Sequence, residues 1–143
     1  MKKVLFYTNQ FFGQIGGEDK AYEKPFVKEG PVGPAMGFAQ ALKDAEIVAT
    51  IICGDNYYVE NMDEVKSFIK EQLGHYKVDL FIAGPAFNAG RFGIACADAC
   101  AFVKKEAGIE AITGLYSENP AVEMYKRDIY ILETGKSAAS MKK

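Results

Sequence analysis

Short, continuous apolar runs recur along the chain and alternate with segments whose apolar residues are spaced three or four apart. The runs Val4-Leu5-Phe6 and Leu80-Phe81-Ile82 contain no polar residue, and the run at residues 47–52 contains only one. Strands buried on both faces show such runs, whereas half-exposed strands alternate apolar and polar residues. The pattern therefore predicts the strands of a mainly parallel sheet at residues 3–8, 46–53, 78–84, 110–114 and 128–133.

Helices are predicted between these strands, at residues 34–44, 62–73, 90–107 and 120–125. Asn61, followed three positions later by Glu64, resembles a capping box, and Gly74 is expected to end the second helix. Asn119 precedes a proline and is the expected cap of the last helix.

The alternation of strands and helices predicts an α/β fold with right-handed crossovers. We expect one domain over residues 1–143, with a five-stranded, mainly parallel sheet in the order 2-1-3-4-5. This is a three-layer, doubly wound arrangement of the flavodoxin or Rossmann-like kind. Residues 9–33 depart from the pattern, because they have no periodicity and include five glycines. Loops of this length usually have a function or are ordered by a partner.

The overall charge argues against nucleic acid as a partner. The net charge is −2 and the isoelectric point is about 5.5, and no cluster of lysine or arginine is interleaved with the aromatic residues. No apolar stretch approaches the roughly 20 residues that a membrane helix requires. The apolar run after Lys2 and Lys3 is too short for a signal peptide, so we expect a cytoplasmic protein that does not contact a membrane.

The sequence contains no recognisable catalytic set. Cys53, Cys96 and Cys100 lack the spacing of a redox or zinc motif, and only one histidine, His75, is present. We interpret the cysteines as small buried residues, and His75 as a surface residue on the edge opposite the strand ends. We therefore expect no catalytic residue, no metal site and no cofactor in this chain.

Polar residues that follow the predicted strands are the candidates for binding a small molecule. The carboxyl ends of parallel strands share one edge, where ligands bind and where helix N-termini attract anions. An arginine among glycines at a helix start suits a carboxylate or phosphate. For Asp55 and Asn56, capping a turn is an equally good explanation. The candidate binding residues are Asn9, Glu18, Asp19, Asp55, Asn56, Asn88, Arg91, Glu118 and Asn119.

Several long, unusual blocks carry a resemblance to a known family. They are residues 6–12 (FYTNQFF), 16–20 (GGEDK), 28–34 (KEGPVGP), 52–57 (ICGDNY), 83–91 (AGPAFNAGR), 113–120 (TGLYSENP) and 134–139 (TGKSAA). Together they resemble the amino-terminal region of the B-component selenoprotein subunit of the glycine, sarcosine and betaine reductases, over essentially all 143 residues.

The resemblance implies part of an anaerobic oxidoreductase complex that cleaves the C–N bond of glycine or its N-methyl derivatives and leads to acetyl phosphate. The family's selenocysteine lies in a carboxyl-terminal region without a counterpart here, so no cysteine of this chain takes its role. We expect other subunits of the complex and a small amine substrate as partners, and self-association into a homo-oligomer stays an open alternative.

The expected role is a substrate-binding or scaffold domain that is incomplete alone. In this hypothesis Arg91 pairs with the substrate carboxylate, and Glu18 or Asp19 with its ammonium group. Two alternatives remain. The first is a non-catalytic interaction module that uses residues 9–33, and the second is an independent domain that binds a small anion or a nucleotide.

Overall fold

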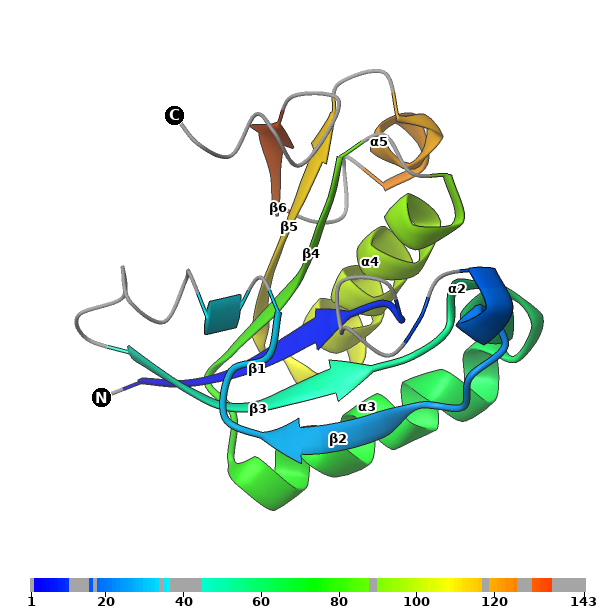
Figure 1. The fold of residues 1–143 in the computed structure, drawn as a ribbon. Helices are drawn as coiled ribbons and strands as arrows, with labels where there is room; N and C mark the ends of the chain where they lie inside the picture. Colours follow the sequence, from blue (N-terminus) through cyan, green and yellow to red (C-terminus); the bar gives the residue numbers. More distant parts are fainter. Residues whose placement is uncertain are drawn as a thin grey trace.

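A computed structural model of the chain describes residues 2–10, 16, 18–33, 35–36, 45–87, 90–116, 119–125 and 130–134. Within them, six strands form one sheet in the order β2-β3-β1-β4-β5-β6 (Figure 1). Neighbouring strands are parallel except for β2, which runs antiparallel to β3 at the edge. The strands are β1 (Lys2–Thr8), β2 (Phe26–Glu29), β3 (Ala45–Ile52), β4 (Leu80–Phe87), β5 (Glu110–Tyr116) and β6 (Tyr130–Thr134).

The predicted α/β class and strand order are confirmed, since β3, β1, β4, β5 and β6 are the five predicted strands in the order 2-1-3-4-5. Strand β2 was not predicted, because it lies within residues 9–33, which we expected to lack regular structure. It is only four residues long, and two of them, Lys28 and Glu29, are charged and exposed. An edge strand needs backbone pairing on one side only, so its sequence can be polar and short.

A hydroxyl group anchors the turn that follows β2. The Oγ1 atom of Thr50 in β3 donates a 2.8 Å hydrogen bond to the carbonyl of Gly30 and accepts a 3.2 Å hydrogen bond from the N–H of Val32. The N–H of Gly30 donates to the carbonyl of Val48 at 2.9 Å. The described second half of the long loop is therefore bonded to the sheet of its own chain.

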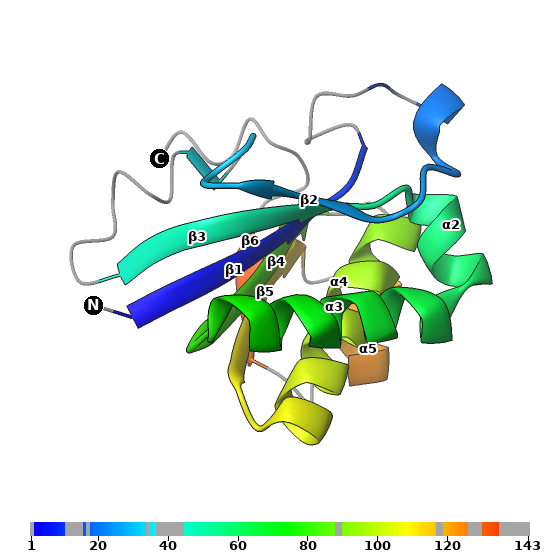
Figure 2. The same ribbon diagram turned by 90° about the horizontal axis from the view of Figure 1, so that it is seen from below.

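Four helices are described, and three of them cover the same face of the sheet. They are α2 (Asp55–Glu60), α3 (Met62–Tyr76), α4 (Gly90–Phe102) and α5 (Pro120–Tyr125). Figure 2 shows α3, α4 and α5 on one side of the strands. A π-helical turn (Val103–Ala107) continues α4, and Gly108 ends it in the left-handed conformation with φ 66°. A 3-10 turn spans Glu18–Lys20.

Two predictions about these elements were wrong, and one helix was missed. Helix α2 was not predicted, because its six residues are too few for a periodic pattern. Helix α3 does not end at Gly74 but continues to Tyr76, and Lys77 is the left-handed residue that ends it, with φ 54°. Asn61 makes no side-chain capping bond and instead donates to the carbonyl of Tyr57.

Strand β4 also extends three residues past its predicted end at Gly84. Its pairing with β5 changes register between Ala83 and Phe87. Gly84 has φ 92°, and a Cβ atom there would lie 2.8 Å from the backbone nitrogen of Ala86. The irregular strand therefore requires glycine at this position.

Alternate residues of β1 supply two hydrophobic clusters, one on each face of the sheet. Leu5 and Tyr7 belong to the larger cluster, which also contains the buried residues of α3, α4 and α5. Val4 and Phe6 face the other way and pack with Ala35 and Ile47. Of the helix predicted at residues 34–44, the structure describes only residues 35–36, so the layer predicted on this second face stays a prediction.

Candidate functional site

The carboxyl ends of β1, β3, β4 and β5 meet at one edge of the sheet, because these strands are parallel neighbours. We call this edge, with the residues directly after each strand, the strand-end rim; ligand crevices of open parallel sheets lie in this position. Among the described residues, the buried polar side chains all lie at or beyond the middle of one of these strands. They are Thr8, Asn9, Gln10, Thr50, Thr113 and Asn119.

Two amide side chains after β1 connect the rim to the start of α2. The Nδ2 atom of Asn9 donates a 3.0 Å hydrogen bond to Oδ2 of Asp55. The backbone N–H of Asp55 donates in turn to Oε1 of Gln10 at 3.2 Å. Asn9 and Gln10 are almost fully buried, and Asp55 is half-buried. Two of the candidate residues, Asn9 and Asp55, are thus in direct contact, and hydrogen bonds to a charged group of this kind are worth about 1.5–3 kcal/mol each.

The N-terminus of α2 is closed by the chain's own backbone. The N–H groups of Asn56 and Tyr57 both donate to the carbonyl of Ala21, at 2.8 and 3.0 Å. The N–H of Gly54 donates to the carbonyl of Glu23 at 2.9 Å, and a Cβ atom on Gly54 would lie 2.3 Å from the carbonyl oxygen of Ala21. Residues 21–23 therefore occupy the position that an anion would take at this helix start. Asn56 uses its backbone for this contact, and a ligand role for its half-buried side chain stays a prediction.

Arg91 is, with Asp19, one of the two candidates that the structure shows to be exposed. It lies exposed in the first turn of α4, directly beyond the end of β4. Asn119, which lies beyond the end of β5, packs against Gly93 at the start of α4. A Cβ atom on Gly93 would lie only 2.6 Å from the Nδ2 atom of Asn119. Asn119 also caps α5 as predicted, since its Oδ1 accepts the N–H of Ala121 at 3.0 Å. A role of Asn119 in ligand binding is not tested by this contact.

The remaining candidates are placed less fully. Asp19 is exposed within the 3-10 turn, and the structure describes only the backbone of Glu18. Asn88 and Glu118 lie outside the described residues. His75 is exposed in the last turn of α3, away from the rim, as expected.

Phenol and thiol groups gather in the core directly below the rim. Tyr7, Tyr58, Cys53 and Cys96 are all fully buried, and the Tyr7 and Tyr58 rings meet edge to face with centroids 6.0 Å apart. Burial raises the pKa of Cys53 from 9.0 to about 12, and the neighbouring Tyr7 hydroxyl only partly offsets this rise. Burial also raises the pKa of Tyr7 and of Cys96 well above their usual values, and nearby groups including Asp55 add to this effect.

The third cysteine, Cys100, is also buried, and burial raises its pKa. The described thiols are therefore protonated near neutral pH, and a protonated thiol is a poor nucleophile. The prediction that the cysteines are small buried residues is confirmed.

Two structural features are absent from the described part of the chain. It contains no group of three or more histidine, cysteine, aspartate or glutamate residues that could hold a metal ion. None of its helices combines the length and the apolar character needed to cross a bilayer.

The sequence predicted that Asn9, Gln10 and Asp55 lie at the same edge, but Gln10 was not among the candidate binding residues, and Tyr7 was overlooked. Gln10 directly follows Asn9 in the sequence, so its position after a strand was the available signal. Tyr7 lies within an apolar run, where an aromatic residue looks like ordinary core, and the pattern holds no sign that its hydroxyl faces thiols.

Comparison with known proteins places the chain in a family. The family model described as glycine/sarcosine/betaine reductase selenoprotein B matches residues 1–143. The chain is 52% identical over 141 residues to the sarcosine reductase complex component B subunit beta of Peptoclostridium acidaminophilum. It is likewise 52% identical to the glycine reductase complex component B subunit gamma of Carboxydothermus hydrogenoformans. No solved structure matches.

A betaine reductase complex component B subunit beta, also from Peptoclostridium acidaminophilum, is 46% identical over 142 residues. The matches cover 98–99% of this chain but only 32% of each of these relatives. The chain thus spans about a third of their length. Because the family model covers every residue, the chain belongs to the glycine/sarcosine/betaine reductase selenoprotein B family.

Proposed function

We propose that this chain is the amino-terminal substrate-binding and scaffold domain of a reductase B component that acts on glycine, sarcosine or betaine. The similarity covers 98% of this chain and 32% of its relatives, which supports a role as one part of a longer subunit. The reaction in this proposal is reductive cleavage of the substrate C–N bond, leading to acetyl phosphate. The selenocysteine that attacks the substrate belongs to the carboxyl-terminal region of the subunit, so this domain is incomplete alone.

The single observation that carries a binding role is the exposed position of Arg91. All three substrates in question bear a carboxylate, and a guanidinium group can bind a carboxylate through two parallel hydrogen bonds. Arg91 lies in the first turn of a 13-residue helix, where the partial positive charge of the helix favours an anion as well. In this proposal the carboxylate lies at Arg91, and the ammonium group lies toward the acidic residues Glu18 or Asp19. Asn88 and Glu118 complete the predicted set of contacts.

The buried thiols support a scaffold role for the core beneath the rim. Cys53, Cys96 and Cys100 are protonated and shielded from solvent, so they neither attack the substrate nor exchange with a redox partner. In this proposal the domain binds and orients the substrate, and the chemical step takes place on the other part of the subunit. We infer a cytoplasmic location and no resident cofactor for this domain.

Calorimetric titration of the chain with glycine, sarcosine and betaine, one at a time, tests the binding role. We expect saturable binding of at least one of them, weakened about tenfold or more by Arg91→Ala. Lys70→Ala is the matched control, because Lys70 is an exposed cation on α3 and we expect its loss to leave binding unchanged. Binding that survives Arg91→Ala would refute the role of Arg91. No binding of any of the three would leave the domain as scaffold alone.

A second candidate function is an interaction module that uses residues 9–33. Tyr22 favours it, because its side chain is 62% exposed on the segment that closes the start of α2. Exposed tyrosines are common anchors of protein interfaces. Sedimentation analysis of the chain and of Tyr22→Asp tests this candidate: a complex that dissociates in the variant supports it, and a chain that is monomeric in both forms rules out self-association through this segment.

A further inference from the structure

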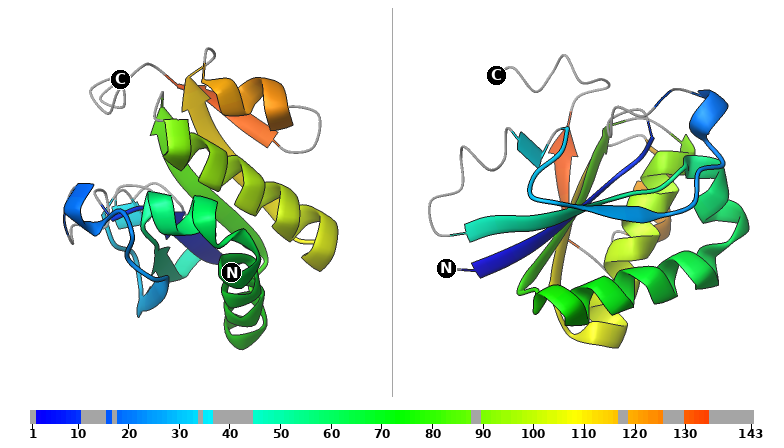
Figure 3. Two further views of the ribbon diagram at one scale, coloured as in Figure 1. Left: turned by 90° about the vertical axis from the view of Figure 1, so that its right-hand side faces the viewer. Right: turned by 60° about the horizontal axis from the view of Figure 1, so that its bottom comes forward.

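Helices α3 and α4 lie at an angle to one another, as both views in Figure 3 show. Residues of both helices line a groove. The α3–α4 groove has a volume of about 640 Å³. It lies on the outer surface of the helix layer, and its lining comes from α3, α4 and the π-helical turn. The lining residues are Lys66, Asp98, Ala101, Phe102, Lys104, Lys105 and Glu106.

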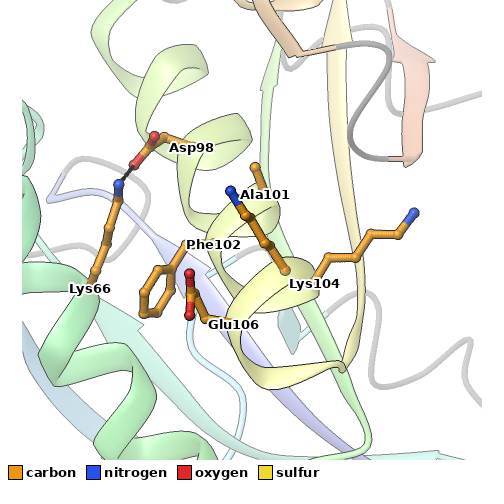
Figure 4. A pocket seen from close by; sticks show the side chains of 7 residues that line it. Lys66, Asp98, Ala101, Phe102, Lys104 and Glu106 are labelled. Atoms are coloured by element: carbon orange, nitrogen blue, oxygen red, sulfur yellow. Dashed lines mark ion pairs between the residues drawn. The ribbon is translucent and has the colours of Figure 1, made fainter.

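A fixed polar network forms one wall of the groove. The ammonium group of Lys66 lies 3.1 Å from Oδ2 of Asp98 and 5.9 Å from the centre of the Phe102 ring (Figure 4). The fully buried Tyr58 donates a 2.7 Å hydrogen bond to the same Asp98 oxygen. Lys66 is thereby held between a carboxylate and an aromatic ring. This wall is formed before any partner arrives, which lowers the entropy cost of binding.

The groove lining carries a small excess of positive charge. Lys66 and Asp98 neutralise each other, which leaves Lys104 and Lys105 against Glu106 on the exposed π-helical turn. The chain as a whole carries a net charge of −2, so the groove is a locally cationic region of an acidic domain. Such a region attracts and orients an acidic partner. Single π-helical turns within helices also occur frequently at functional sites.

The shape of the groove indicates the kind of partner. The lining residues Lys104, Lys105 and Glu106 of the groove are exposed, and Ala101 and Phe102 are only half-buried. A small molecule is usually enclosed by its site, whereas an open trough between two helices fits an elongated segment that lays an apolar side chain into it.

We propose that the α3–α4 groove docks an acidic, helical segment of another subunit of the reductase complex. Carboxylates of this segment face Lys104 and Lys105, and one of its apolar side chains covers the Phe102 ring. The chemistry of the segment follows from the groove, and its origin in a reductase complex rests on the proposed function. The relatives are themselves named as components of such complexes.

A designed peptide tests the proposal with the chain as it stands. The probe is a fluorescent amphipathic peptide of about 16 residues, since shorter isolated helices are marginal in water. It carries glutamates along one face and leucines along the other, and a matched peptide carries lysine in place of every glutamate. Fluorescence anisotropy gives the affinity, and amide chemical shifts locate the bound peptide. We expect saturable binding of the acidic peptide only, with shifts centred on Ala101, Phe102 and Lys66.

Charge variants of the groove lysines complete the test. We expect K104E/K105E to weaken binding of the acidic peptide about tenfold, because two attractive contacts become repulsive. K104Q/K105Q should give an intermediate loss, which separates charge from any change in folding. K28E is the matched control, since Lys28 is an exposed lysine of β2 outside the groove lining. The K28E variant should bind the acidic peptide as tightly as the parent chain does.

Three results would overturn the proposal: no saturable binding of the acidic peptide, equal binding of the basic peptide, or binding that the Lys104 and Lys105 variants leave unchanged. Displacement of the peptide by inorganic phosphate at constant ionic strength would also overturn it, because the groove would then be a small-anion site. The substrate titrations do not involve this groove. A failure of the docking proposal can therefore be told apart from a failure of the proposed function.

Discussion

The hydroxyl group of Tyr58 donates a 2.7 Å hydrogen bond to Oδ2 of Asp98, and this contact joins two regions of the protein. Tyr58 lies in the core, where its ring meets Tyr7 below the strand-end rim. Asp98 lines the α3–α4 groove and is paired with Lys66. The short helix α2 is therefore fixed to α4 by a buried phenol that reaches from the core to a charged surface.

Tyr58→Phe removes the hydroxyl group that donates this hydrogen bond and leaves the ring in place. We expect it to lower the free energy of unfolding by about 1.5–3 kcal/mol, the usual contribution of a hydrogen bond to a charged group. Urea denaturation followed by circular dichroism measures the change. Tyr22→Phe is the control, because its side chain is exposed and we expect a change within about 0.5 kcal/mol. Equal stability of the two variants would show that the Tyr58 hydroxyl contributes nothing net.

Gly54 and Gly74 should respond to alanine in opposite directions. A methyl group on Gly54 would meet the Ala21 carbonyl at 2.3 Å, so we expect Gly54→Ala to cost about 1–3 kcal/mol and to loosen residues 21–23 from α2. Gly74 lies inside α3 with no atom within 4 Å of the added carbon, so Gly74→Ala should stabilise the chain by up to about 1 kcal/mol. Thermal unfolding measures whether each variant is less or more stable than the parent chain. Amide hydrogen exchange at residues 21–23 shows whether this segment opens in Gly54→Ala.

The buried thiols should make the protein sensitive to alkali. The pKa of Cys53 is raised from 9.0 to about 12 by burial, so the folded state holds this proton more tightly than the unfolded state does. Its stabilising effect is therefore complete below pH 9 and is lost as the pH rises toward 12. We expect the midpoint of urea unfolding to fall over this range, and to fall less steeply in Cys53→Ala.

Labelling with a thiol reagent at pH 8 checks the same burial directly. The three cysteines should react slowly in the folded chain and completely in urea, because only the thiolate is reactive and each thiol is fully buried. A cysteine that reacts at once in the folded chain would contradict the burial.

Continuous apolar runs predicted the three inner strands β1, β3 and β4, because a strand buried on both faces is apolar over most of its length. Strand β2 and helix α2 were not predictable in this way. Both are short, and both are stabilised by contacts with distant residues: β2 by pairing with β3, and α2 by the Ala21 carbonyl at its start. Such contacts leave no periodic pattern in the local sequence.

The candidate site was predictable to the level of the edge on which it lies. Parallel strands bring their ends together, so the contact between Asn9 and Asp55 follows from topology once the strands are assigned. The bond from Asp55 to Gln10 and the inward position of Tyr7 depend on side-chain packing. The end of α3 shows the same limit, since glycine often ends a helix but Gly74 is accommodated within one and Lys77 takes the left-handed conformation.

The central place of β1 in the sheet has a consequence for how the protein is made. This strand is synthesised before both of its neighbours in the sheet, because it pairs with β3 on one side and with residues 80–83 of β4 on the other. The emerging chain therefore carries a strongly apolar strand with one unpaired edge until residues 80–83 have been translated. Long-range pairings of this kind form slowly and leave an aggregation-prone surface meanwhile. Production of the folded chain should therefore improve when chaperones cover this strand until β4 has been made.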